Sequence, residues 1–155
     1  MKRKKQYTLI ALISILSLTG CGNKANRITL TCTGEKDNSS GIEVQNITTY
    51  HFNEEQYATD YSVVTTQKFK DKKVYKEYKS AQENTIKTNS QEDIIYDLKS
   101  DDKKLSLVFT MSFKNIDKKA TDDKKKTIKA KSILNTYKER NISCTLKGIT
   151  EKKLK

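Results

Sequence analysis

Apolar and polar residues alternate with a period of two over much of the chain, beginning at residue 28. Ile28, Leu30 and Cys32 alternate with three threonines, which is the pattern of a strand with one buried face. Comparable alternation follows in two longer stretches. The sequence therefore predicts three consecutive strands, over residues 28–33, 42–52 and 57–69, joined by polar turns at 37–41 and 53–56.

The period changes to three or four residues after Asp71. Apolar residues recur at Val74, Tyr75 and Tyr78 among lysines and glutamates, so we expect a surface helix over 72–84. Asp71 stands just before this helix, where an aspartate can accept hydrogen bonds from the first free backbone amides. We therefore expect Asp71 to be the N-cap.

Two further alternating stretches surround the turn sequence Ser-Asp-Asp-Lys at 100–103. The second stretch alternates without interruption from Leu105 to Phe113. These features predict a β-hairpin with strands over 94–98 and 105–113.

The last third of the chain combines a charged stretch with one more helix and one more strand. Residues 114–126 are expected to form a loop. Helical spacing of apolar residues predicts a helix over 127–140, with Thr127 as its N-cap and Asn141 in the left-handed conformation at its end. A final strand is expected over 142–146.

This order of elements lacks the regular strand–helix–strand rhythm of parallel sheets. We therefore expect a single α+β domain over residues 28–155. Its predicted architecture is an antiparallel β-sheet with two helices packed on one face.

The first twenty-one residues have the pattern of an export signal. Residues 2–5 are all basic and an apolar run follows over 9–18, which is shorter than the ~20 apolar residues that a spanning helix needs. Leu18-Thr19-Gly20-Cys21 resembles the lipobox of bacterial lipoproteins. In that family the cysteine thiol receives a diacylglyceryl group, and the chain is cleaved just before it.

The lipobox resemblance implies a lipoprotein signal peptide over 1–20, a lipid on Cys21 and a short tether over 21–27. Two acyl chains hold a protein stably on a bilayer. The expected location is the extracytoplasmic face of the cell membrane in a Gram-positive bacterium, with the diacylglyceryl anchor in the membrane. An ordinary secretory signal that happens to contain a cysteine is the alternative.

Two cysteines remain after Cys21, namely Cys32 and Cys144. An even number of cysteines in an exported domain favours a disulfide between them. Two free thiols are the alternative, since many exported Gram-positive proteins avoid disulfides. A metal site is disfavoured, because two thiolates and the single histidine, His51, make a poor zinc ligand set.

The chain is strongly basic, with a formal net charge of +12. Residues 114–131 hold eight lysines and three aspartates. An export signal and the lack of interleaved arginines and aromatics argue against nucleic acid. A surface that contacts anionic lipid or wall polymer fits the expected location better, and a merely solvated lysine-rich surface is the simpler alternative. The lysines concerned are Lys124, Lys125, Lys126, Lys129 and Lys131.

Signals for catalysis are weak. None of the five glycines lies between residues 42 and 147, which argues against a phosphate-binding loop or a nucleophile elbow in the body of the domain. His51 could act as a general base, but no motif supplies its partners, so an exposed or packed side chain is the simpler interpretation. We expect no catalytic residue, no cofactor and no metal.

Tyrosines supply much of the aromatic content, because the chain has no tryptophan. Tyr50, Tyr57 and Tyr61 fall in neighbouring predicted strands and could line a ligand surface. Core packing is the alternative for these residues.

The chain also resembles the small lipoproteins related to YehR. The resemblance rests on the lipobox, the "LTCT" at 30–33, a central helix before a hairpin, and a last helix followed by a short strand with a cysteine. It implies an α+β fold and the pairing of Cys32 with Cys144, and it supplies no catalytic residue.

These observations favour a lipid-anchored extracytoplasmic module that binds rather than catalyses. Its expected partners are the membrane, an anionic lipid or wall polymer, or a membrane protein. One alternative is a small solute-capture accessory of a membrane transporter, with a concave apolar site near Tyr50 and Tyr61. A weaker alternative is an envelope hydrolase that depends on His51 or on a carboxylate.

Overall fold

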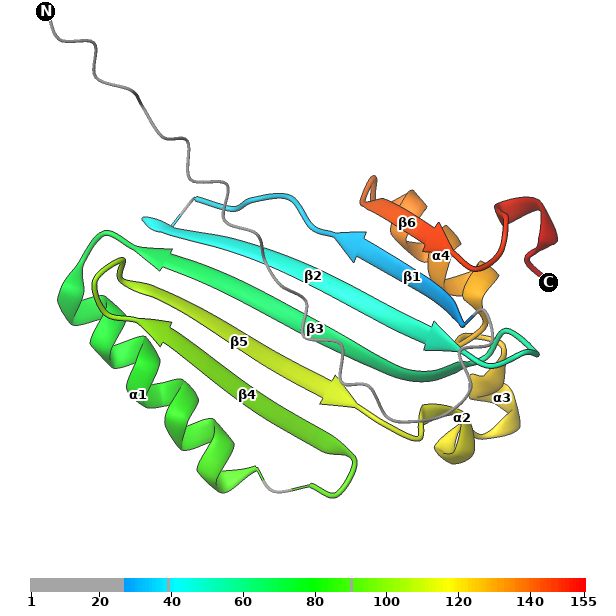
Figure 1. The fold of residues 1–155 in the computed structure, drawn as a ribbon, viewed down its shortest axis with the longest axis horizontal. Coiled ribbons are helices and arrows are strands. Elements are labelled where there is room, and N and C mark those ends of the chain that lie inside the picture. Colours follow the sequence, from blue (N-terminus) through cyan, green and yellow to red (C-terminus); the bar gives the residue numbers. More distant parts are fainter. Residues whose placement is uncertain (1–26, 39, 90) are drawn as a thin grey trace, which may run out of the picture.

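One antiparallel sheet of six strands forms the body of the molecule (Figure 1). In a computed structural model, residues 27–38, 40–89 and 91–155 are described. The strands lie in the order β4-β5-β3-β2-β1-β6, and every neighbouring pair is antiparallel. Their bounds are β1 (Ile28–Thr33), β2 (Ile42–Phe52), β3 (Ala58–Phe69), β4 (Ile94–Asp101), β5 (Ser106–Phe113) and β6 (Ser143–Lys147).

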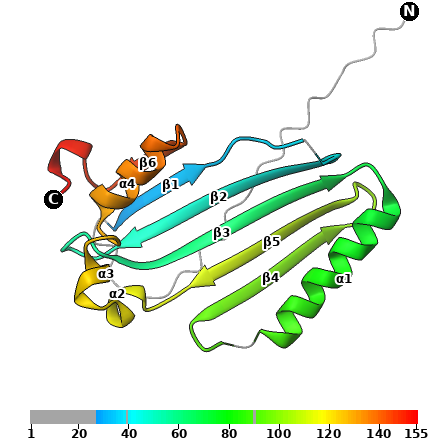
Figure 2. The same cartoon turned by 180° about the vertical axis from the view of Figure 1, so that it is seen from behind.

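The helices lie near the two outer ends of this sheet, as both views show (Figures 1 and 2). The longest helix packs beside β4 and β5, and the others gather near β1, β2 and β6. Their bounds are α1 (Lys72–Thr88), α2 (Ile116–Lys119), α3 (Asp122–Lys125), α4 (Ala130–Glu139) and a terminal 3₁₀ turn, η1 (Glu151–Lys153). Among the described residues, no helix is both long and apolar enough to span a bilayer.

The two main helices pack on the same face of the sheet. Leu30, Tyr50, Tyr61 and Phe113 stand opposite one another in a single row across β1, β2, β3 and β5, so they share a face. α4 packs on Leu30 at one end of this row, and α1 packs on Leu107, which lies on the same side of β5 as Phe113. The α+β class and the antiparallel sheet are therefore as expected.

The core is divided between these two ends. The larger cluster joins β1, β2 and α4, and the smaller one joins β2, β3, β5 and α1. The buried members of the first are Leu30, Cys32, Phe52, Ala58, Ala130, Ile133, Leu134 and Leu154, and those of the second are Ile42, Phe69, Tyr75 and Leu107. The middle of the helix-bearing face belongs to neither buried cluster.

Helix α1 begins as expected, with Asp71 as its N-cap. The Oδ1 atom of Asp71 accepts hydrogen bonds from the backbone N–H groups of Lys73 at 2.7 Å and Val74 at 2.9 Å. The left-handed conformation of Asn141 is also confirmed, with φ of 56°.

Two expectations for the last third of the chain are wrong. The stretch 114–126 is not a plain loop, because it contains the single turns α2 and α3. Thr127 is not an N-cap: its hydroxyl donates to the carbonyl of Lys124 at 2.7 Å. Helix α4 begins only at Ala130, since Lys129 still pairs in extended conformation with Tyr57.

Candidate binding surface

A row of stacked aromatic rings crosses the middle of the helix-bearing face. The ring of Tyr61 lies 4.4 Å from that of Phe113 and 5.3 Å from that of Tyr50, centroid to centroid. The planes of Tyr61 and Phe113 are almost parallel, at 9°. All three side chains are only half-buried, and they lie between the parts of the sheet that α1 and α4 cover. We call Phe113, Tyr61 and Tyr50 the aromatic row.

The pairing register of the strands produces this row. Tyr50 stands directly opposite Tyr61, and Tyr61 directly opposite Phe113, and side chains at directly opposed positions lie close enough to contact. Because Tyr61 has a ring on each side, its faces are covered by its neighbours. The row therefore presents ring edges and tyrosine hydroxyls, rather than ring faces, to whatever binds above it.

A pocket continues the row beneath α4. The hydroxyls of Tyr50 and Tyr137 lie 3.2 Å apart, at hydrogen-bonding distance, and the ring of Tyr137 meets that of Tyr50 edge-on at 69°. The pocket has a volume of about 250 Å³. Its lining combines phenol and threonine hydroxyls, one aliphatic side chain and one guanidinium, from Tyr50, Thr127, Ile133, Thr136, Tyr137 and Arg140.

The two sheet tyrosines keep their hydroxyl protons at physiological pH. Burial raises the pKa of Tyr50, and the hydrogen bond with Tyr137 raises it further. Burial likewise raises the pKa of Tyr61. A neutral phenol can both donate and accept a hydrogen bond, so these groups suit a ligand with hydroxyl, carbonyl or carboxylate oxygens.

Tyr57 does not belong to this surface. The ammonium of Lys129 lies 5.1 Å from the centroid of the Tyr57 ring, within the range of a cation–π contact. Of the three tyrosines singled out in the sequence, Tyr50 and Tyr61 come together and Tyr57 does not. Phe113 and Tyr137 were missed, because their place beside Tyr61 and Tyr50 depends on strand and helix neighbours far apart in the chain.

Cys32 and Cys144 lie opposite each other on β1 and β6. Their Sγ atoms are 2.09 Å apart, the bonding distance of a disulfide. Cys32 is buried in the larger core cluster, and Cys144 packs against the same cluster.

Cys21 and the expected signal peptide and tether, up to residue 26, lie outside the described residues.

The lysines singled out in the sequence lie on and around α3 and α4. Lys124 and Lys125 belong to α3, Lys126 follows it, and Lys131 belongs to α4. Lys125 pairs with Asp122 at 2.8 Å. Lys124, Lys126 and Lys131 are exposed and form no ion pair with any described residue, so their charges are available to an external anion.

His51 lies on the face of the sheet opposite α1 and α4. Its Nδ1 atom is 2.6 Å from Oδ1 of Asp60, on the neighbouring strand. The other carboxylate oxygen of Asp60 accepts hydrogen bonds from Arg27 and from the hydroxyl of Thr59, each at 2.8 Å. Periodicity does not predict this cluster, because Arg27 and Asp60 are 33 residues apart.

Among the described residues, the histidine cluster has only the histidine–aspartate contact of a catalytic triad. A histidine that serves as a general base is oriented on one ring nitrogen and contacts the nucleophile with the other. Within the described ranges, Nε2 of His51 has no hydrogen-bond partner. The same ranges hold no group of three or more His, Cys, Asp or Glu side chains that could ligate a metal ion.

Comparison of the chain with protein-family models, with curated proteins and with solved structures finds no match. Its resemblance to the lipoproteins related to YehR therefore stays a prediction.

Proposed function

We propose that this chain is a lipid-anchored binding module on the extracytoplasmic face of the cell membrane, and that it does not catalyse a reaction. The observation that supports binding most directly is the aromatic row of Phe113, Tyr61 and Tyr50. Helices α1 and α4 pack on the same face of the sheet on either side of this row, and its three rings stay half-buried.

Aromatic side chains are among the largest contributors to binding energy, because a ligand that covers them removes apolar area from water. In the aromatic row that surface is already ordered by stacking between neighbours. Ordered side chains lose little conformational entropy when a ligand covers them. A half-buried, preorganised row is therefore a favourable place for an apolar ligand group to bind.

The neighbouring pocket indicates the polar part of the ligand. Arg140 supplies a permanent positive charge, and the paired hydroxyls of Tyr50 and Tyr137 supply donors and acceptors. An amphipathic ligand fits this combination, with an apolar part on the aromatic row and an acidic or hydroxylated group in the pocket. Free fatty acids and lipid-linked acidic envelope polymers both contain such pairs of groups.

The anchor rests on the sequence. A lipid on Cys21 would begin six residues before Arg27, and a segment of that length reaches at most about 20 Å when fully extended. The domain would therefore sit close to the bilayer surface. Exposed Lys124, Lys126 and Lys131 support a contact with anionic lipid or wall polymer there.

The pocket beneath α4 also favours a second candidate, capture of a small solute for a membrane transporter. Its volume of about 250 Å³ lies just below the usual range for pockets that enclose drug-sized ligands. A solute with few non-hydrogen atoms would fit it. Thermal unfolding with individual metabolites would favour this candidate if one small compound raised the midpoint and R140Q removed the shift.

Photocross-linking on intact cells tests the aromatic row. A photoreactive phenylalanine analogue replaces Tyr61, and the same analogue at Tyr78 serves as the control, since Tyr78 is an exposed aromatic on α1 outside the row. We expect a reproducible adduct from position 61 and none from position 78. Equal adducts from the two positions, or none from either, would contradict the proposed binding surface.

The anchor is tested by the intact mass of the protein purified from membranes. We expect a chain that begins at Cys21 and carries the mass of a diacylglyceryl group. C21S should remain unprocessed and unlipidated. An unlipidated wild-type chain in the culture medium would contradict the anchor while leaving the binding surface untouched.

A further inference from the structure

Strand β4 forms one edge of the sheet, and among the described strands it pairs with β5 alone. Residues of an antiparallel strand direct their backbone groups alternately toward the two neighbours. The backbone carbonyl of Asp93 accepts a hydrogen bond from the backbone N–H of Lys114, which stands opposite it in the same register. The backbone groups of odd-numbered residues in β4 therefore point toward β5. Tyr96, Leu98 and Ser100 consequently direct their N–H and C=O groups outward, where no strand pairs with them.

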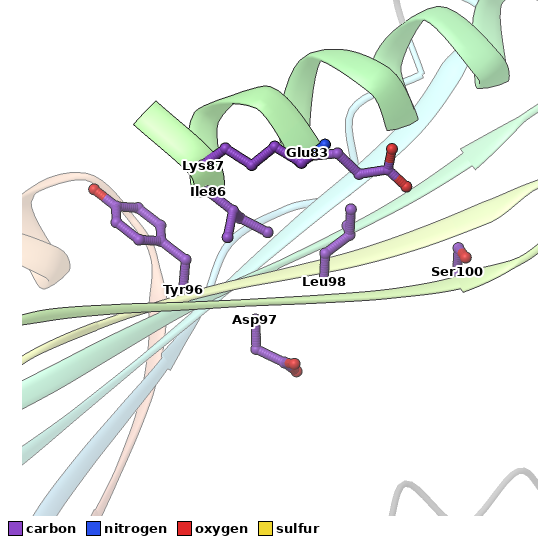
Figure 3. Close-up of a pocket in the computed structure, with 7 residues that line it drawn as sticks. All are labelled: Glu83, Ile86, Lys87, Tyr96, Asp97, Leu98 and Ser100. Carbon is purple, nitrogen blue, oxygen red and sulfur yellow. The ribbon is translucent and has the colours of Figure 1, made fainter. Parts of the chain in front are cut away.

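The side chains of β4 carry two opposite charges on one face. Asp97 and Lys99 lie on the face opposite α1, both exposed, and neither has an ion-pair or hydrogen-bond partner among the described residues. Leu98 lies between them and points the other way, toward α1, as Figure 3 shows for Leu98 and Asp97. Asp97 and Lys99 are two residues apart on the same face. If a second copy of this strand ran antiparallel beside the first, each of these charges could face the opposite charge.

We propose that β4 pairs antiparallel with β4 of a second copy of this chain, about a two-fold axis at Leu98. Leu98 then stands opposite Leu98 of the second copy, and Tyr96 stands opposite its Ser100. The outward backbone groups of all three residues find partners. On the other face, Asp97 stands opposite Lys99 of the second copy, and the two-fold axis repeats this ion pair.

Charge selects this register over its neighbours. A step of two residues is the smallest that keeps every side chain on its own face. In one direction such a step places Asp97 opposite Asp97, and in the other it places Lys99 opposite Lys99. Directly opposed like charges destabilise a strand pair, so the register centred on Leu98 is the favoured one.

On the helix side, α1 runs along β4 at this edge of the sheet (Figures 1 and 2). A pocket of about 370 Å³ lies between α1 and β4. Ile86 points from α1 toward Leu98 on the strand, with Tyr96 beside them (Figure 3). These apolar side chains suit the leucine that the second copy would place next to Leu98.

An exposed isoleucine supports the same partner. Ile95 is 47% exposed, which is unusual for a large hydrophobic residue in this structure. In the proposed register it lies diagonally next to Lys99 of the second copy. The methylene groups of a lysine can cover apolar surface while its ammonium stays in water.

Charge reversal tests the pairing with two differently tagged copies of the full chain, co-expressed and co-purified in mild detergent. We expect wild-type copies to co-purify. D97K alone and K99D alone should each lower the recovery about tenfold, because both repeated contacts become repulsive. A D97K copy co-expressed with a K99D copy should recover wild-type pairing, since each supplies the charge that the other lost.

A backbone variant tests the edge independently of charge. S100P removes an outward N–H group and no hydrogen bond to β5, so we expect lost pairing with little change in thermal unfolding, and S100A is its matched control. Recovery that D97K and K99D leave unchanged would overturn the proposal. So would a mixed pair that recovers no better than either variant alone.

A third outcome identifies another occupant. If the copies stay separate while a different protein co-purifies and is lost with S100P, the edge serves that protein and pairing between copies is wrong. None of these variants alters the aromatic row, so the result is independent of the photocross-linking at Tyr61.

Discussion

At the scale of the residue, Asp60 is held as a carboxylate by the groups around it. Burial alone would raise its pKa, but the hydrogen bonds from His51 and Thr59, together with the charges of His51 and Arg27, outweigh burial. The pKa of Asp60 is therefore lower in the folded protein than in the unfolded chain, where it is near 3.9.

Acid should consequently remove part of the stability that Asp60 provides. A carboxyl with a lowered folded pKa stabilises the fold above its unfolded pKa, and this contribution is lost as the pH falls through the folded pKa. Below about pH 4, the free energy of unfolding should fall less steeply in D60N than in wild type. Urea unfolding between pH 3 and 7 measures the difference.

Asp123 offers the matched control, since it is exposed and forms no ion pair with a described residue. D123N should keep the wild-type steepness. An acid response of D60N as steep as that of wild type would show that the His51–Asp60 contact contributes nothing to stability.

Single residues also show how far the sequence could predict the candidate site. Tyr50 and Tyr61 stood out because alternation placed them in adjacent strands joined by a short turn. Phe113 also lay in a predicted strand, but its contact with Tyr61 requires β3 to pair with β5, and helix α1 and strand β4 separate these two in the chain. Periodicity reports which face a residue occupies and not which strand lies beside it.

At the scale of the element, α1 and α3 differ in how their first turns are capped. The carboxylate of Asp71 accepts two backbone hydrogen bonds at the start of α1. Thr121 occupies the same position before α3 and makes no such bond with its side chain. Capping therefore contributes to one helix and not to the other.

D71A should lower the free energy of unfolding by about 1 kcal/mol, the typical cost of losing an N-cap side chain. T121A should stay within about 0.5 kcal/mol of wild type, as surface substitutions usually do. Chemical denaturation of the two variants beside wild type measures both values. Equal losses would mean that the hydrogen bonds of Asp71 add nothing to α1.

The elements also differ in how well local sequence predicts them. Helix α1 has both a regular period and a capping aspartate, and its start was predicted correctly. The start of α4 was not, because the backbone of Ile128 and Lys129 is used elsewhere. Ala58 donates to the carbonyl of Ile128 at 2.9 Å, and Lys129 pairs with Tyr57. These contacts link segments about 70 residues apart, and they override the helical preference of residues 127–129.

At the scale of the whole molecule, the pair of Cys32 and Cys144 ties β6 to the rest of the sheet. Among the described strands, β6 pairs only with β1. The two cysteines are 112 residues apart, so a bond between them closes most of the domain into one loop. A loop of that length contributes about 4–5 kcal/mol in the chain-entropy model.

Reduction should therefore lower the midpoint of thermal unfolding of the wild-type protein by many degrees. A C32A/C144A variant is the matched control, because its midpoint should be low and insensitive to reductant. Differential scanning calorimetry with and without dithiothreitol measures both. A wild-type midpoint that does not move on reduction would favour the alternative of two free thiols.

The strand order separates the point of attachment from the pairing edge. β1, which follows the proposed anchor, lies four strand spacings from β4, or about 19 Å. Two copies joined through β4 would therefore place their β1 strands on opposite flanks of one continuous sheet, about 40 Å apart across the strands. Such an assembly would rest on the bilayer at two points, which restricts its tilt. Detaching it would require both lipids to leave the membrane together, so it would stay bound far longer than either copy alone.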